Sequence, residues 1–239
     1  FGGRVFEYYS EDPVLSGKLG AACVAGARQH GVYAYVKHFA LNETETFREG
    51  LITWCNEQAM RELYLKAFET PVKEGGTTAI MSAFNHIGAT WAGGSHALMT
   101  DVLRNEWGFQ GAVVTDYYMG DSVTPNMNGY AGLYAGNDLW LAPMVGTVMS
   151  MNVDISSPTI VNQLRNACHN ILYMSANSNL VDTSYAANAD LDVTPVAEKD
   201  SGIPLWAILF YGIFDGLYVI GAVVSIVFIV RMRKKDKAD

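Results

Sequence analysis

The chain has 239 residues, half of them hydrophobic, and a formal net charge of −8. The acidic balance argues against a nucleic-acid partner, because binding to phosphates requires a basic face. The three cysteines, Cys23, Cys55 and Cys168, are far apart and form no paired motif. Neither a disulfide framework nor a zinc site is therefore predicted, and no metal or other cofactor is expected.

Strand and helix patterns alternate over residues 1–176. The strands are short apolar runs, and the helices carry apolar residues three or four positions apart. In chain order we expect a helix at 10–31, a strand at 32–39, a helix at 56–69, a strand at 78–83, a helix at 97–107, a strand at 112–115, a strand at 138–143 and a helix at 160–174. The segment 40–48 and the stretch before 138 are interpreted as loops. This alternation predicts an α/β protein with a parallel sheet.

The expected helix ends carry residues typical of caps. Ser10 is a candidate N-cap for the first helix, Pro13 is tolerated in its first turn, and Gly31 ends it. Ser95 is the candidate N-cap of the helix at 97–107. The first helix has apolar or small residues at helical spacing, namely Leu15, Leu19, Cys23 and Ala27.

Four such strands are half of those in a closed (β/α)8 barrel, which takes about 250 residues. We therefore expect residues 1–176 to form about the second half of a TIM-type barrel. The rest of the barrel is expected in a segment upstream of Phe1.

The strand at 112–115 runs directly into Asp116. A small and β-branched apolar run is typical of a strand buried on both faces. In barrels of alternating strands and helices, the carboxyl ends of the strands carry the chemistry. Asp116 is thus a candidate catalytic residue, with capping of the next turn as the alternative.

Other strand ends offer polar groups that would converge on the same barrel mouth. They are Arg4, Lys37, His38, Asn85 and His86. Cations and a histidine around one carboxylate suit a hydroxyl-rich ligand and covalent catalysis by the acid. The alternatives are a surface role for Lys37 and a satisfied core position for His38.

The C-terminal part has a different composition. Residues 177–202 are polar and read as a linker, whereas 203–230 are almost entirely apolar, with Asp215 as the one charged residue. Such a run exceeds the roughly 20 residues that cross a bilayer. The basic tail at 231–239 predicts a single-pass membrane protein with a cytoplasmic C-terminus and an extracellular globular part. A buried core helix is the alternative.

Four stretches resemble family-3 glycoside hydrolases of the β-glucosidase type. The sequence KHFALNETETFR at 37–48 is similar to the family's KHFxxNxxETxR segment. Similar matches occur at 2–13 (a GR turn followed by SEDP), at 98–116 (LMTDVLRNEWGF, then GAVVTD) and at 135–139 (AGNDL). The matches lie in the order expected for the family.

The resemblance implies roles for individual residues. Asp116 matches the catalytic nucleophile, and Arg4, Lys37 and His38 match residues that hold sugar hydroxyls. Tyr117 stands where the family usually has Trp beside the nucleophile. Phe84 stands where Tyr is common, which removes a hydroxyl group. The implied ligands are β-linked glucosides or oligosaccharides.

A retaining glycosidase needs two carboxyl groups about 5 Å apart. Asp116 must be ionised to attack the anomeric carbon, and cationic neighbours favour that state. In the β-glucosidase branch the acid/base is a Glu from a separate domain, which we expect upstream. The alternative function is a non-catalytic sugar-binding protein, or a degenerate membrane-anchored relative.

Overall fold

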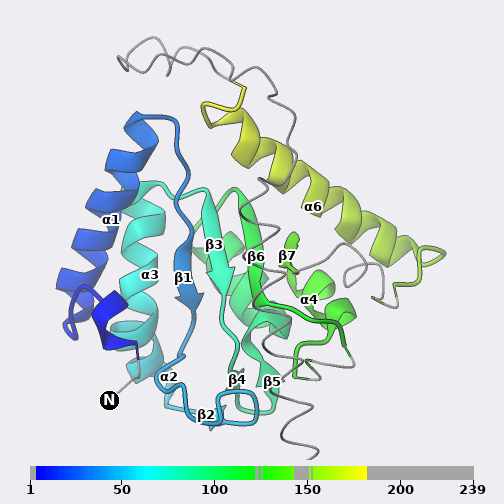
Figure 1. Cartoon of the computed structure of the whole chain (residues 1–239), viewed down its shortest axis with the longest axis horizontal. Coiled ribbons are helices and arrows are strands. Elements are labelled where there is room, and N and C mark those ends of the chain that lie inside the picture. Colours follow the sequence, from blue (N-terminus) through cyan, green and yellow to red (C-terminus); the bar gives the residue numbers. More distant parts are fainter. Residues whose placement is uncertain (1–3, 122–123, 125, 143–150, 152, 182–239) are drawn as a thin grey trace, which may run out of the picture. The chain divides into compact units, whose positions relative to one another are not determined.

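The computed structural model describes residues 4–121, 124, 126–142, 151 and 153–181 (Figure 1). The predicted apolar span at 203–230, the basic tail and most of the predicted linker lie outside these residues. Among the residues that the structure describes, no helix is both long and apolar enough to span a bilayer.

A four-stranded parallel sheet forms the centre of the fold (Figure 1). Its strands, in spatial order, are β1 (Val36–Phe39), β3 (Ala79–Ser82), β6 (Ala112–Tyr117) and β7 (Leu139–Leu141). Ile80 pairs with Val36 on one side and with Val113 on the other. Each new strand is added on the same side of the previous one, with a helix between them. This single direction of winding is that of a barrel, so the predicted partial TIM-type architecture is confirmed.

The helix between β1 and β3 is longer than predicted and changes its hydrogen-bonding pattern. Asn56 caps its start by accepting a 2.8 Å bond from the Ala59 amide. It consists of α2 (Glu57–Ala59), η2 (Met60–Leu65), α3 (Lys66–Thr70) and η3 (Pro71–Gly75), of which η2 and η3 are π-helical. Pro71, which has no amide hydrogen to bond the preceding turn, lies where the helix changes from α3 to the π-helical turn η3. The helix ends at Gly76, which has a φ of 66°.

Helix α1 (Pro13–Gln29) has a different cap from the one expected, and its buried face does not contain Leu15, Leu19 or Cys23. Asp12, rather than Ser10, caps the helix by accepting a 2.7 Å bond from the Leu15 amide. Leu15 and Leu19 are exposed, as is Cys23. The buried face consists of small residues, Gly17, Gly20, Ala21 and Val24.

Close packing explains this choice of face. A Cβ atom at Gly17 would lie 2.8 Å from the Cβ of Thr70 on α3, and one at Gly75 would lie 2.9 Å from the Cα of Ala21. The two helices approach so closely that only small side chains fit between them.

Several short elements were not predicted. The turn η1 (Val5–Glu7) precedes α1, and a second sheet follows the carboxyl ends of β1 and β3 (Figure 1). This sheet contains β2 (Ile52–Thr53), β4 (His86–Ile87) and β5 (Thr90–Trp91), and the turn η4 (Ala92–Gly94) follows it. Helix α4 (Gly129–Ala135) lies in a stretch predicted as loop. Its glycines have low helix propensity, but Gly132 packs directly against the Trp91 ring.

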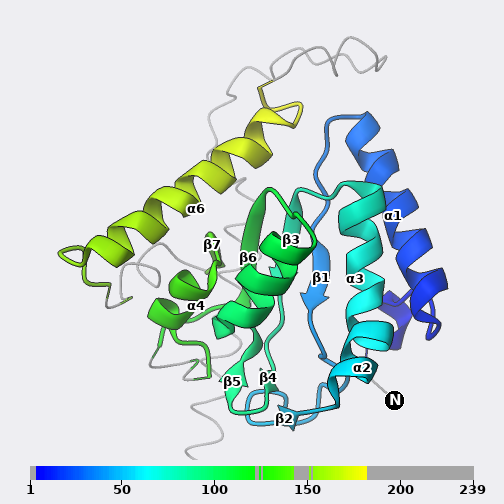
Figure 2. The same cartoon turned by 180° about the vertical axis from the view of Figure 1, so that it is seen from behind.

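The principal core lies between the sheet and the helices seen in front of it in Figure 2. Helix η5 (Ala97–Glu106), also π-helical, contributes Met99 and Leu103. These residues pack with strand residues Phe39, Ile80 and Val113, which are fully buried. The N-cap position of η5 is His96, one residue after the expected Ser95, although Ser95 still accepts a 3.3 Å bond from the Leu98 amide. The last helix, α6 (Pro158–Ala176), buries Ile160, Ala167 and Met174 as its pattern predicted, although Leu164 is 37% exposed.

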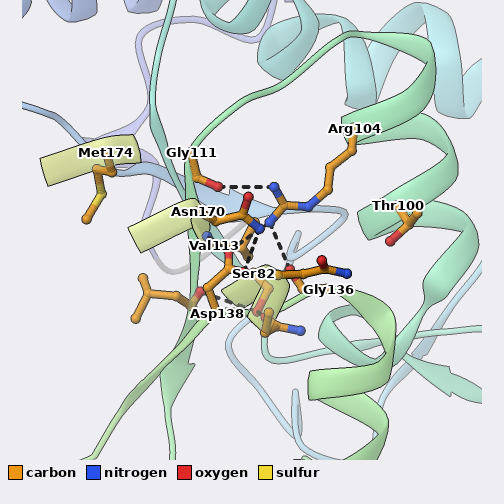
Figure 3. Close-up of polar contacts among 12 residues, drawn as sticks. Ser82, Thr100, Arg104, Gly111, Val113, Gly136, Asp138, Asn170 and Met174 are labelled. Atoms are coloured by element: carbon orange, nitrogen blue, oxygen red, sulfur yellow. Dashed lines mark hydrogen bonds and ion pairs between the residues drawn. The ribbon is translucent and has the colours of Figure 1, made fainter. Parts of the chain in front are cut away.

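A buried ion pair joins η5 to the strands that it covers (Figure 3). Arg104 Nη2 lies 2.7 Å from Asp138 Oδ2, and Arg104 also donates to the carbonyl oxygens of Gly111 and Gly136. The same Asp138 oxygen accepts from the Val113 amide at 2.7 Å, and the other accepts from Asn170 of α6. Burial raises the pKa of Asp138, while Arg104 opposes that shift.

Asp138→Asn should therefore destabilise the protein strongly. It leaves the Arg104 charge buried without its counter-ion, which typically costs about 3–5 kcal/mol. Urea unfolding followed by tryptophan fluorescence measures the loss. Glu106→Gln is the control, because it breaks the exposed Arg61–Glu106 pair and should cost under about 1 kcal/mol. Equal losses in the two variants would contradict the interpretation.

Candidate active site

Asp116 lies at the carboxyl end of β6 and is 7% exposed. Its Oδ1 atom accepts a 2.7 Å hydrogen bond from the Tyr117 amide, which is the local contact expected if Asp116 had a capping role. Its Oδ2 atom is buried and has no hydrogen-bond donor among the described residues. One carboxylate oxygen is thus held in place, and the other is available for chemistry.

His38, at the end of β1, faces the available oxygen. His38 Nε2 lies 3.7 Å from Asp116 Oδ2, and both side chains are buried. On its other side, Arg4 Nη1 lies 3.4 Å from the same nitrogen. Because a guanidinium group can only donate, this contact fits the neutral tautomer of His38 that has its proton on Nδ1 and accepts at Nε2. The structure thus joins three of the predicted site residues.

The environment favours the neutral form of His38. Burial lowers its pKa, and the charges of Lys37 and Arg4 lower it further, while the Asp116 carboxylate raises it. An Nε2 atom without a proton cannot donate to Asp116, which is consistent with their separation of 3.7 Å. A ligand hydroxyl near the two atoms could donate its one proton to either acceptor, but not to both.

The Lys37 side chain is more exposed than that of His38, and its ammonium group lies 3.2 Å from Glu7 Oε2. The same Glu7 carboxylate forms two bonds with Arg4, at 2.6 Å and 2.8 Å. Our sequence reasoning assigned no role to Glu7. The sequence held one sign of the Arg4–Glu7 contact. Glu7 follows Arg4 by three residues, and a 3₁₀ turn places such residues side by side.

Phe84 and Tyr117 occupy different surroundings. Phe84 is 4% exposed, packs with Trp91, Tyr118 and Met127, and has the Arg48 guanidinium 4.7 Å from its ring centroid. Tyr117 is 44% exposed on β6, so its ring is accessible for stacking. The contacts of Phe84 and Tyr117 with a sugar are still predictions from the sequence.

Two asparagines add to the polar character of this end of the sheet. Asn85 donates 3.2 Å to the Ala40 carbonyl oxygen, while its own side-chain oxygen is buried and has no partner within the described part of the chain. The side-chain oxygen of Asn42 is also buried and also has no hydrogen-bond partner among the described residues. The described residues contain no group of three or more His, Cys, Asp or Glu that could hold a metal ion.

The fold and site define a class: a parallel α/β half-barrel with a buried carboxylate and basic groups at the carboxyl ends of its strands. Residues 2–168 match the profile of the Glycosyl hydrolase family 3 N terminal domain. The chain therefore belongs to glycosyl hydrolase family 3.

Individual relatives agree with this assignment. Beta-glucosidase A of Butyrivibrio fibrisolvens is 45% identical over 138 residues, which cover 57% of this chain and 16% of that protein. An exo-alpha-(1->6)-L-arabinopyranosidase of Bifidobacterium longum is 44% identical over 116 residues, or 48% of this chain and 15% of that protein. Beta-glucosidase 3B of Thermotoga neapolitana, solved in complex with alpha-D-glucose, has a TM-score of 0.64 at 35% identity, covering 78% of this chain and 26% of that one. The chain thus spans only a small part of the length of these relatives.

The lowered pKa of His38 predicts how stability depends on pH. The unfolded chain binds a proton near pH 6.5, whereas the folded chain binds it only at lower pH, so folding should weaken as pH falls below about 6.5. A single such group contributes a slope of up to about 1.4 kcal/mol per pH unit. Urea unfolding between pH 8 and pH 5 should show a steeper loss for the wild type than for His38→Asn.

His86 serves as the internal control for this comparison. Burial lowers its pKa too, but it is present in both proteins, and its contribution cancels. Parallel stability curves for the wild type and His38→Asn would contradict the assignment of a neutral, buried His38.

Proposed function

We propose that the protein containing this chain hydrolyses terminal β-D-glycosidic bonds, with β-glucosides as the main substrates. Asp116 acts as the nucleophile of a retaining mechanism. The observation that carries the proposal is the Asp116 carboxylate, with Oδ1 fixed by the Tyr117 amide and Oδ2 buried without a donor opposite His38. Membership of glycosyl hydrolase family 3, together with two β-glucosidase relatives, supports it.

The reaction takes two steps. Asp116 Oδ2 attacks the anomeric carbon, the bond to the leaving oxygen breaks, and a general acid gives that oxygen its proton. Water then attacks the glycosyl-enzyme ester, losing a proton to the same group as the sugar leaves and the carboxylate re-forms. We assign this acid/base to a carboxyl group in a domain beyond these 239 residues.

In this proposal the groups around Asp116 bind the sugar. Arg4 and Lys37 donate hydrogen bonds to hydroxyl groups, and the neutral His38 accepts one through Nε2. Tyr117 offers an exposed ring for stacking, whereas Phe84 lies beside the site as a packed apolar residue. The preferred sugar is an open choice within this proposal. The relative from Bifidobacterium longum is named an exo-alpha-(1->6)-L-arabinopyranosidase and not a beta-glucosidase.

A non-catalytic sugar-binding role is the second candidate. Phe84 favours it, because it has no hydroxyl group to engage the nucleophile, and the Arg48 guanidinium covers its ring. The two candidates differ in one respect only: whether Asp116 forms a bond with the sugar.

A mechanism-based label separates them. A 2-deoxy-2-fluoro-β-glucoside with a dinitrophenolate leaving group needs no proton donor, so this chain can be tested as it is. Intact-mass and peptide analysis should find one fluoroglucosyl group on Asp116 and none in Asp116→Asn. Binding of glucose without any covalent label would favour the second candidate.

We also propose that the apolar run at 203–230 anchors the protein in a membrane, with the globular part extracellular. The support is the length of the run and the basic residues that follow it. The full chain should float with phosphatidylcholine vesicles in a density gradient, and a chain ending at residue 200 should not. Sedimentation of both proteins away from the lipid would rule the anchor out.

A further inference from the structure

We propose that Glu7 is a positioning residue for the nucleophile: its carboxylate holds Arg4 and Lys37 in place and keeps Arg4 from pairing with Asp116. This inference rests on the proposed function. Glu7 contacts neither Asp116 nor His38 directly, so any effect on the nucleophile passes through the two cations.

The contacts of Glu7 form one compact bridge. Oε1 lies 2.6 Å from Arg4 Nε, and Oε2 lies 2.8 Å from Arg4 Nη2 and 3.2 Å from Lys37 Nζ. The bidentate pair fixes the plane of the guanidinium group as well as its position. One carboxylate therefore ties the turn η1 to the end of β1.

This arrangement decides which side of Arg4 faces the site. Two of its nitrogens are bonded to Glu7, and Nη1 is left to lie 3.4 Å from His38 Nε2. The next acceptor beyond His38 is Asp116 Oδ2, 3.7 Å from that same nitrogen. A guanidinium group released from Glu7 would pair with Asp116 Oδ2, because this buried oxygen has no donor among the described residues. Such a pair would occupy the atom that must attack the sugar.

The charge on Glu7 is constant over the useful pH range. The hydrogen bond from Arg4 lowers the pKa of Glu7 to about 2, and Lys37 acts in the same direction. Glu7 therefore stays ionised wherever His38 titrates.

The turn that carries Glu7 has an independent attachment. The Tyr8 hydroxyl donates a 3.2 Å bond to the Asn42 carbonyl oxygen. Removing the Glu7 charge should leave the turn in place and release only the Arg4 guanidinium and Lys37 ammonium groups. Since partly exposed ion pairs add little to stability, Glu7→Gln should change the unfolding free energy by under about 1 kcal/mol.

The chain offers a matched control in Glu69. Its carboxylate also bridges two cations, Lys66 at 3.0 Å and Lys73 at 2.6 Å, and its side chain is 22% exposed compared with 26% for Glu7. Glu69 lies on helix α3, away from the carboxyl ends of the strands. Glu69→Gln therefore removes an equivalent bridge with no connection to Asp116.

The first measurement does not depend on catalysis. In protein labelled with ¹⁵N-histidine, the His38 Nε2 resonance, assigned with His38→Asn, should shift in Glu7→Gln, because Arg4 leaves that nitrogen. It should stay unchanged in Glu69→Gln. An unchanged resonance in Glu7→Gln overturns the positioning role, whether or not the protein proves to be a glycosidase.

The second measurement is the rate at which the fluoroglucoside labels Asp116. Glu7→Gln should lower the maximal rate about 100-fold, as expected for a misplaced reacting group, and Glu69→Gln should match the wild type. Glu7→Asp, which keeps the charge, should recover part of the loss. Adding Arg4→Met to Glu7→Gln should raise the maximal rate above that of Glu7→Gln alone, because no guanidinium group remains to occupy Asp116.

The outcomes separate the two proposals. A wild-type protein that is never labelled contradicts the proposed function, while the histidine resonance still decides the role of Glu7. Labelling of Glu7→Gln at the wild-type rate overturns the role of Glu7 and leaves the nucleophile assignment standing.

Discussion

The parallel pairing of β1, β3 and β6 is the constraint on which the rest depends. Because these strands run in one direction in aligned register, their carboxyl ends meet at one edge of the sheet. His38 and Asp116, nearly 80 residues apart in sequence, come within 3.7 Å at that edge. The site needs no long-range loop to assemble it, because the backbone hydrogen bonds of the sheet already do so.

The charges at this edge alternate along one path. Lys37, Glu7 and Arg4 are connected by ion pairs, and neutral His38 separates that group from the Asp116 carboxylate. Neutral His38 lies between the Arg4 guanidinium group and the Asp116 carboxylate. It allows a cation to lie close to the carboxylate without a direct bond that would neutralise it.

Sequence patterns predicted the four strands, their parallel arrangement and the meeting of Asp116 with His38, because these features follow from apolar periodicity and strand direction. Arg4, which was grouped with the strand ends, lies instead in the turn before η1. The sequence patterns failed where tertiary packing overrides local preference. Leu15 and Leu19 had the helical spacing, but the approach of α1 to α3 admits only residues such as Gly17. The stretch before 138 was interpreted as a loop, yet α4 forms there, and its Gly132 packs against Trp91. The bridging role of Glu7 depends on the side-chain contacts of a short turn, which carries no periodic signal.

The Arg104–Asp138 pair supports the start of β6 rather than its carboxyl end, because its contacts are to Gly111, just before the strand, and to Val113 (Figure 3). At about 3.3 Å per strand residue, Val113 and Asp116 are about 10 Å apart. The groups that hold β6 in place and the groups that meet a ligand are therefore separate sets. If Asp116 serves the proposed glycosidase, the side chains at the carboxyl end of β6 could be exchanged to change sugar specificity while the Arg104–Asp138 support stays in place.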